Sequence, residues 1–267
     1  MGQTTLLFLP KIEAVLNPDA LKYFSGKIHI LGEVDSTNKY AKRLAERGCE
    51  DGTVVVAESQ TEGHGRQGRS FYSPAHTGLY FSVVFKKFHS KTGEFNPATF
   101  TMTAAVAICR AVKKVYDVDC GIKWPNDIYC NGKKVAGILC EGVMRQNRLE
   151  SAILGIGLNV TTSVFPDELK DVASSIAPNK ELHRNHLLAE TLNAFLDLST
   201  MDFATEIMNE YRAASILTGK KVTVLSARGN FCAIAQRVEA NGLLVVTDEN
   251  GKEISLNSAE VHLHLER

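Results

Sequence analysis

KWPNDIYCNGKKVAGILC, at residues 123–140, holds two apolar runs on either side of an Asn131-Gly132 pair. An Asn-Gly pair between such runs is the strongest short-range signal of a β-hairpin, because the tight turn needs positive φ at both positions. The sequence therefore predicts paired strands over 127–130 and 135–140. Strand-like patterns extend over the whole of 120–160, so this region is expected to build much of a sheet.

Further helical and strand patterns lie outside this region. One helix is predicted to begin at 35–38, where Asp, Ser, Thr and Asn side chains can accept hydrogen bonds from unpaired helical amides, and to end at Gly48. Another begins at Asn96-Pro97 and carries apolar residues at helical spacing. The other predicted elements are strands over 53–57 and 79–85 and two later helices, the second ending near Gly219 with one face formed by Phe203, Ile207, Tyr211, Ala214 and Leu217. The fold class is therefore α+β, with helices and a mixed or antiparallel sheet.

The last fifty or so residues have a different pattern. Short strands are predicted over 221–225, 231–235, 243–247 and 253–256, separated by the turn pairs Arg228-Gly229, Asn241-Gly242 and Asn250-Gly251. This spacing is typical of a small all-β unit of SH3-like size. We therefore expect a large domain over 1–217 and a small β domain over 218–267.

Composition limits the class of protein. The 267 residues are 44% hydrophobic, which is enough for a proper core, and 30 basic residues balance 30 acidic ones. A zero net charge supplies no general field for nucleic acid or an anionic membrane, so neither is an expected partner. No run approaches the ~20 apolar residues of a membrane span, and the N-terminus lacks the basic start of a signal peptide. Six scattered cysteines are typical of a reducing compartment, so the sequence predicts a cytoplasmic protein.

A glycine-rich segment, GHGRQG at 63–68, matches the GxGxxG pattern. The dinucleotide interpretation fails because an extended run rather than a helix follows Gly68, and a kinase loop fails because neither HRD nor DFG occurs. What remains is a loop whose backbone amides can approach an anion, with Arg66, Arg69 and His64 adding positive charge. A flexible surface turn with solvated arginines is the alternative.

Three further features are compatible with a ligand site. Residues 123–127 place the only tryptophan beside a cation, an amide and a carboxylate, although a strand end with a core Trp would have the same sequence. Strand alternation sends Lys133 and Lys134 to opposite faces, and an inward lysine would imply an anionic ligand. Gly155 and Gly157 would let a flat ligand lie against backbone, although strand glycines also mark bulges.

Five segments together resemble the biotin–protein ligase family, in the family's order and at about its spacings over roughly 28–267. They are VDSTN (34–38), ESQTEGHGRQGR (58–69), KWPND (123–127), KKVAGIL (133–139) and GIGLNV (155–160). The resemblance implies a class II synthetase-like catalytic domain and a C-terminal SH3-like β-barrel. It also implies that biotin and ATP, with Mg²⁺, give biotinyl-5′-adenylate, and that biotin then passes to a lysine of a carboxylase's biotin carboxyl carrier domain.

The resemblance also implies roles for individual residues. Lys134 and Arg66 would be catalytic. The implied biotin-binding residues are Ser36, Thr37, Asn38, Gln60, Gly63, His64, Gly65, Arg66, Lys134, Gly137, Gly155 and Gly157. The implied nucleotide-binding residues are Arg66, Arg69, Lys123, Trp124, Asn126, Asp127, Lys134 and Asn159. No metal ligands are assigned, because Asp127 could hold Mg²⁺ or cap its own turn.

The sequence departs from the family at His64, where the glycine-rich loop commonly has a basic residue. A neutral imidazole supplies less charge to the adenylate. Only some thirty residues precede Val34, too few for the DNA-binding module of some members, so we expect the monofunctional form. The alternatives are a lipoate or octanoate ligase or transferase of the same superfamily and a non-catalytic biotin-sensing regulator. A homodimer is compatible with the family, but the sequence does not decide it.

Overall fold

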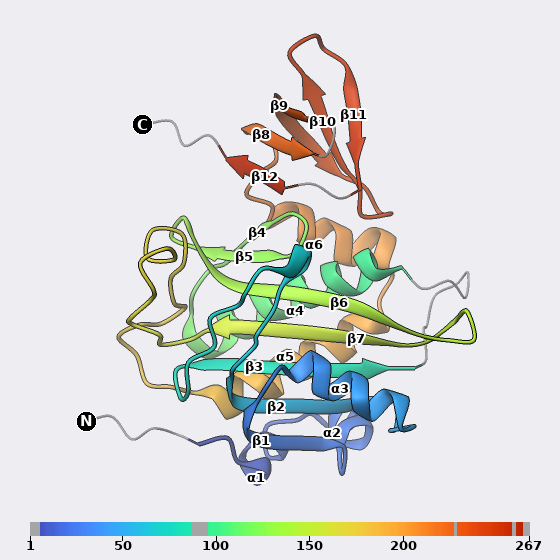
Figure 1. The fold of residues 1–267 in the computed structure, drawn as a ribbon, viewed down its shortest axis with the longest axis vertical. Helices are drawn as coiled ribbons and strands as arrows, with labels where there is room; N and C mark the ends of the chain where they lie inside the picture. Colours follow the sequence, from blue (N-terminus) through green and yellow to red (C-terminus); the bar gives the residue numbers. More distant parts are fainter. Residues whose placement is uncertain (1–5, 87–95, 227–228, 258–259, 264–267) are drawn as a thin grey trace.

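A seven-stranded mixed sheet forms the centre of the protein in a computed structural model that describes residues 6–86, 96–226, 229–257 and 260–263 (Figure 1). The strand order is β1-β2-β3-β7-β6-β5-β4. Strands β1 and β2 are parallel, and the other neighbours are antiparallel. The strands are β1 (Ile28–Val34), β2 (Thr53–Gln60), β3 (Gly78–Phe85), β4 (Gly121–Lys123), β5 (Asp127–Cys130), β6 (Lys133–Arg145) and β7 (Arg148–Asn159). The α+β prediction is confirmed.

The hairpin of β5 and β6 is also confirmed. Asn131 and Gly132 have φ values of 49° and 77°, as a tight hairpin turn requires. The register then places Asp127 beside Gly137, and Gly137 beside Gly157 of β7. The turn places Asp127 beside Gly137, and the separate pairing of β6 with β7 adds Gly157, so residues of three motifs lie across neighbouring strands.

Helices cover both faces of this sheet (Figure 1). On one face, α4 (Pro97–Tyr116) and α5 (Arg184–Ser199) pack over a large apolar core. On the other, α3 (Thr37–Glu46) contributes Ala41 and Ala45 to a smaller cluster. The other helices are α1 (Leu9–Glu13), α2 (Pro18–Phe24) and α6 (Met208–Ala213). Strand β2 serves both clusters, because Val54 belongs to the large one and Val55 to the small one, as the alternation of strand side chains requires.

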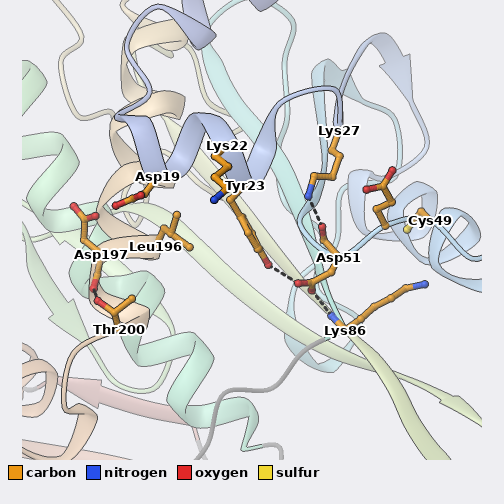
Figure 2. Close-up of a pocket in the computed structure, with 11 residues that line it drawn as sticks. Asp19, Lys22, Tyr23, Lys27, Cys49, Asp51, Lys86, Leu196, Asp197 and Thr200 are labelled. Carbon is orange, nitrogen blue, oxygen red and sulfur yellow. Dashed lines mark hydrogen bonds between the residues drawn. The ribbon is translucent and has the colours of Figure 1, made fainter.

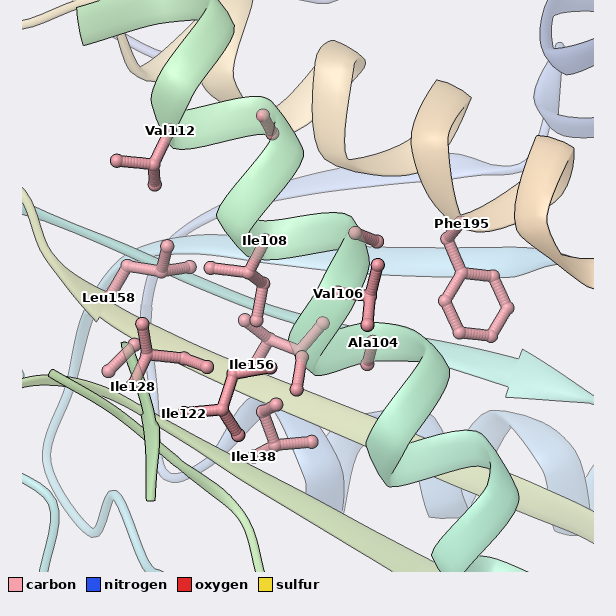
Figure 3. Packing of buried hydrophobic residues seen from close by; sticks show 14 of the residues in the cluster. Ala104, Val106, Ile108, Val112, Ile122, Ile128, Ile138, Ile156, Leu158 and Phe195 are labelled. Carbon is pink, nitrogen blue, oxygen red and sulfur yellow. The ribbon is translucent and has the colours of Figure 1, made fainter. Parts of the chain in front are cut away.

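The large apolar core joins α4 and α5 to the sheet. Ile108 and Val112 of α4 point toward the sheet, where they meet strand residues such as Ile128, Ile138 and Ile156 (Figure 3). The helix begins as predicted, because the Asn96 side chain accepts a hydrogen bond from the amide of Ala98 at 2.9 Å, with Pro97 in the first turn. Figure 3 also shows Phe195 of α5 beside α4.

The predicted helix with the 203–217 face is partly wrong. A π-helical turn, Phe203–Ile207, runs into α6, which ends at Ala213 instead of near Gly219. Ile207, Tyr211 and Leu217 are buried as expected. Ile122 accounts for the early end, because its amide and carbonyl bond to Ala214 and Ile216, which pulls this segment onto β4.

A second, antiparallel sheet has the order β11-β10-β9-β8-β12. Its strands are β8 (Lys221–Ser226), β9 (Gly229–Val238), β10 (Leu244–Asp248), β11 (Glu253–Leu256) and β12 (Glu260–Leu263). Sequence patterns indicated the first four, and the last strand on which we expected His262 is β12. Arg228 of one predicted turn lies outside the described residues. Val222, Val224 and Ala235 of this sheet belong to the same buried cluster as α4, and the boundary at 217/218 stays a prediction. No helix in the described ranges has the length and apolar character to cross a membrane.

Candidate functional site

One cavity of about 390 Å³ collects residues from all five motif segments. Ser36, Gly65, Asn126, Lys134 and Gly157, which lie far apart in the sequence, all line it. Of the candidate site residues named from the sequence, Gly63 alone is not part of the described lining. A Cβ at Gly63 would come within 2.6 Å of the Phe71 carbonyl oxygen, so this glycine is needed for close packing within the loop.

A hydrogen-bonded polar wall joins α3 to β2. The Oε1 atom of Gln60 accepts a hydrogen bond from the Thr37 amide at 2.8 Å, so a side chain from β2 satisfies the first amide of the helix. The Nε2 atom of Gln60 donates to Ser73 Oγ at 2.9 Å. We expected side chains of 35–38 to take up such amides; Asp35 Oδ1 does accept from the Ser36 amide at 2.7 Å, but the partner of the Thr37 amide is a distant glutamine. Because both ends of its amide are held, Gln60 presents a fixed pattern of donors and acceptors.

Asn38 is held even more tightly. Its Nδ2 atom donates to Glu141 Oε2 at 2.6 Å, and its Oδ1 atom lies 2.6 Å from Ser82 Oγ. A Cβ at Gly155 would lie 2.0 Å from Asn38 Oδ1. Gly155 therefore makes room for the Asn38 side chain, and because it also lines the cavity, its contact with a flat ligand stays a prediction.

Gly157 has a comparable role beneath an aromatic ring. A Cβ there would come within 2.6 Å of Phe71 Cε1, whereas one at Gly137 would keep 3.5 Å from the same ring and from Lys134. The Phe71 ring lies against the strand backbone at the place where the sequence suggested a flat ligand. Phe71 itself lines the cavity, so it supplies an apolar wall.

The glycine-rich loop closes on itself. The Gly65 amide donates to the Arg69 carbonyl at 2.7 Å, and the Phe71 amide donates to the Gly63 carbonyl at 2.8 Å. The expectation of amides open to an anion therefore fails for Gly65 in this conformation. The cationic side chains of Arg66 and Arg69 still line the cavity.

The charged groups of the cavity centre on Asp127. Its Oδ1 atom lies 2.7 Å from Lys134 Nζ, with the lysine side chain 34% and the aspartate side chain 21% exposed. Arg66 Nη1 donates to Asn126 Oδ1 at 3.3 Å. Burial lowers the pKa of the Arg66 guanidinium, although Asp127 opposes that shift. A half-buried guanidinium is stabilised by an anion, and a bound phosphate or carboxylate would supply one.

The two adjacent lysines of β6 separate as strand alternation predicts. Lys134 lines the cavity, whereas Lys133 does not and donates from Nζ to the carbonyl of Lys170 at 2.8 Å. Nearby, Lys123 Nζ lies 5.4 Å from the centre of the Tyr129 ring, and both residues line the cavity. The lining also includes Asn159, whose buried Oδ1 has no hydrogen-bond partner among the described residues.

Several wall residues were not predicted. Phe165, Leu169, Val172 and Ala173 come from the segment after β7, and the backbone of Lys134 holds this segment through bonds to Val172 and Ser174. Val261 and His262 come from β12 of the second sheet. The one sequence signal for the first group is its apolar character, which also fits a core.

A second depression lies elsewhere, between α2, α5 and the segment before β2 (Figure 2). It is wide, about 750 Å³, and no residue of the five motifs is in its described lining. Several of its polar groups are occupied by hydrogen bonds within the fold. Asp51 accepts hydrogen bonds from the Tyr23 hydroxyl and the Lys86 amide, and Lys27 bonds to the Asp51 carbonyl (Figure 2). These contacts fasten strand ends together.

The chain is similar to known proteins over most of its length. A family model described as "Biotin/lipoate A/B protein ligase family" matches residues 31–159. The bifunctional ligase/repressor BirA of Bacillus subtilis is 33% identical over 258 residues, which cover 90% of this chain and 77% of that protein. A biotin–[acetyl-CoA-carboxylase] ligase of Mycobacterium tuberculosis is 28% identical, covering 90% and 89%. The solved biotin protein ligase of Aquifex aeolicus, in complex with biotin and ATP, superposes with a TM-score of 0.76 at 27% identity, covering 90% of this chain and all of that one.

Proposed function

This chain belongs to the biotin/lipoate A/B protein ligase family, and we propose that it is a ligase that activates biotin with ATP and transfers it to a lysine of a biotin carboxyl carrier domain. One observation carries the proposal. Five separated sequence segments share one cavity that combines a fixed polar wall, an apolar wall and several cations. Biotin has matching parts, namely a ureido group, a thioether ring and a carboxylate.

The polar wall fits the ureido group. This group has one carbonyl acceptor and two N–H donors, and each one left unpaired in a buried site would cost about 1–3 kcal/mol. Thr37, Gln60 and Ser36 line the cavity with groups of both kinds. A plain fatty acid or lipoate lacks the ureido group and would leave these protein groups unpaired. The wall therefore favours biotin over those acids.

The first step joins two anions. An oxygen of the biotin carboxylate attacks the α-phosphorus of ATP, the bond to the β-phosphate oxygen breaks, and pyrophosphate leaves. Repulsion between the carboxylate and the nucleotide opposes this approach, so cations must offset it. We assign this role to Lys134, with Arg66 beside it, because both line the same cavity and Asp127 holds the lysine ammonium in place.

Mg²⁺ fits the same site as a companion of the nucleotide. Asp127 is the one carboxylate in the described lining, and the described residues form no cluster of three His, Cys, Asp or Glu side chains able to hold a metal alone. Mg²⁺ commonly binds through one or two carboxylates and substrate phosphates, so Asp127 would hold it together with ATP. The ion would neutralise phosphate charge.

The second step forms the amide. The amine of the carrier lysine attacks the acyl carbon of biotinyl-5′-adenylate, the bond from that carbon to the phosphate-linked oxygen breaks, and AMP leaves with the oxygen. Correct placement of the amine supplies most of the rate. The mixed anhydride must also be kept from water, and apolar residues of the cavity such as Phe71, Phe165 and Val172 suit that task.

Biotin-dependent exchange between ATP and labelled pyrophosphate tests the first step. The exchange is expected with biotin and not with lipoate, and a carrier domain added with biotin, ATP and Mg²⁺ should gain the mass of one biotinyl group on one lysine. Exchange with lipoate alone would move the chain to the lipoate branch of its family. Biotin binding without exchange would indicate a non-catalytic sensor.

A further inference from the structure

Glu141 lies on β6, outside the described cavity lining, yet it ends a chain of hydrogen bonds that leads into the cavity. Its Oε2 atom accepts from Asn38 Nδ2 at 2.6 Å. Asn38 Oδ1 lies 2.6 Å from Ser82 Oγ, and Ser82 Oγ lies 2.8 Å from Thr37 Oγ1. Ser82 is fully buried, and Thr37 is 4% exposed and lines the cavity.

The donor and acceptor of every hydrogen bond in this series follow from Glu141. An ionised carboxylate can only accept, so the amide nitrogen of Asn38 must face it and the amide oxygen must face Ser82. The amide oxygen carries no hydrogen, so the single hydroxyl hydrogen of Ser82 points to Asn38. At the contact between Ser82 and Thr37, the hydrogen must then come from Thr37.

These hydrogen-bond directions decide which groups the cavity offers to a ligand. Two protein acceptors, Ser82 Oγ at 2.8 Å and Gln60 Oε1 at 3.1 Å, compete for the one Thr37 hydroxyl hydrogen, so the hydroxyl offers only lone pairs to the cavity. Gln60 Oε1, 3.1 Å from the same hydroxyl, likewise only accepts. This part of the wall is therefore an acceptor site, which fits an N–H of the ureido group. If the Asn38 amide were reversed, the hydroxyl hydrogens would also reverse: Ser82 would donate to Thr37, Thr37 would donate to Gln60 Oε1, and the Thr37 hydroxyl would offer the cavity one lone pair fewer.

We infer that Glu141 is a positioning residue that sets the hydrogen-bond acceptor capacity of the biotin pocket through Asn38, Ser82 and Thr37; this inference rests on the proposed function. His64 strengthens the arrangement, because its Nε2 atom lies 3.5 Å from the same Glu141 oxygen. The carboxylate thus connects α3, β6 and the glycine-rich loop. Glu141 does not touch the ligand in this account.

The test reverses the hydrogen bond instead of deleting it. In Asn38→Asp, two carboxylates face each other, and we expect the KM for biotin to rise about 10-fold or more. In the double variant Asn38→Asp/Glu141→Gln, the new glutamine amide donates to the new carboxylate in place of the lost amide hydrogen, and Ser82 still donates to the other oxygen of that carboxylate. The KM for biotin should then return to within a few-fold of wild type.

Single substitutions of Glu141 test whether its carboxylate is needed for biotin binding. Glu141→Gln keeps an acceptor for Asn38 and should have little effect, whereas Glu141→Ala should raise the KM for biotin about 10-fold and leave the KM for ATP unchanged. Glu150→Ala is the matched control, because Glu150 lies on β7 of the same hairpin and pairs with Arg145 at 3.2 Å. That variant should behave as wild type.

A second readout needs no ligand. Asn38→Asp should lower the Tm of the free protein, and adding Glu141→Gln should restore it. If neither the KM for biotin nor the Tm recovers in the double variant, or if Glu141→Ala matches Glu150→Ala, the inference is wrong. A wild-type protein without biotin-dependent exchange would overturn the proposed function, whereas an unrestored Tm would overturn the hydrogen-bond chain itself.

Discussion

Lys134→Met removes one ammonium from the cavity and keeps most of the side-chain stem. In the wild type, Lys134 Nζ lies 2.7 Å from Asp127 Oδ1, so the charge is already fixed in place before substrates arrive. Loss of one such preorganised donor typically lowers kcat by about 10²–10³, or about 2.7–4 kcal/mol of transition-state stabilisation. We expect that loss in biotin-dependent pyrophosphate exchange, because attack on the α-phosphorus is the step that brings two anions together.

Lys133→Met is the matched control for this experiment. It removes the same charge from the neighbouring residue, whose Nζ bonds to the Lys170 carbonyl away from the cavity lining. A surface change of this kind is worth within about 0.5 kcal/mol, so the exchange rate should stay within about twofold. Urea unfolding of both variants checks that each is folded. Equal losses in the two variants, or a Lys134→Met enzyme within a few-fold of wild type, would refute the electrostatic role of Lys134.

Two further predictions concern packing and buried charge. Gly157→Ala would place a Cβ 2.6 Å from the Phe71 ring, and the resulting overpacking should lower the free energy of unfolding in urea by about 1–3 kcal/mol. Gly137→Ala leaves 3.5 Å to the same ring and should lower it less. Equal losses in the two variants would show that contact with the Phe71 ring is not the cause. Arg184→Met removes the partner that lies 2.6 Å from Glu58 and should cost about 3–5 kcal/mol at neutral pH, because the arginine is fully buried. Burial alone would raise the pKa of Glu58, but the Leu7 amide and Arg184 together hold this pKa below its ordinary 4.5. The folded wild type therefore loses the stabilisation that these two contacts give the carboxylate as the pH falls below that value. In Arg184→Met the pKa of Glu58 rises instead, so the deficit should shrink with acidification; a deficit that stays constant from pH 7 to pH 4 would oppose this explanation.

Local chemistry made part of the fold predictable. The hairpin at Asn131-Gly132 and the start of α4 at Asn96-Pro97 depend on the preferences of adjacent residues, and both were predicted correctly. The predicted helix end near Gly219 was wrong, because pairing of Ile122 with Ala214 and Ile216 decides it. Such long-range contacts leave no periodic signal in the sequence.

The candidate site, like the fold, could be predicted from the sequence only in part. Motif order and spacing named most of the residues that meet in the cavity, including Lys134 and Asp127. The predicted contact of the strand glycines with a flat ligand stays a prediction, and the sequence did not indicate that Gly155 and Gly157 make room for Asn38 and Phe71. These partners come from other elements, and only the folded chain brings them together.

If the carboxylate of biotin attacks the α-phosphate of ATP inside this cavity, one carboxylate oxygen must pass to AMP, and isotope labelling can follow that oxygen. Biotin with ¹⁸O in its carboxylate, unlabelled ATP and a carrier domain would be converted by the wild-type protein, and the products analysed by mass spectrometry. We expect one ¹⁸O atom in AMP, one in the new amide carbonyl and none in pyrophosphate. AMP without the label, or label in released phosphate or pyrophosphate, would contradict this mechanism.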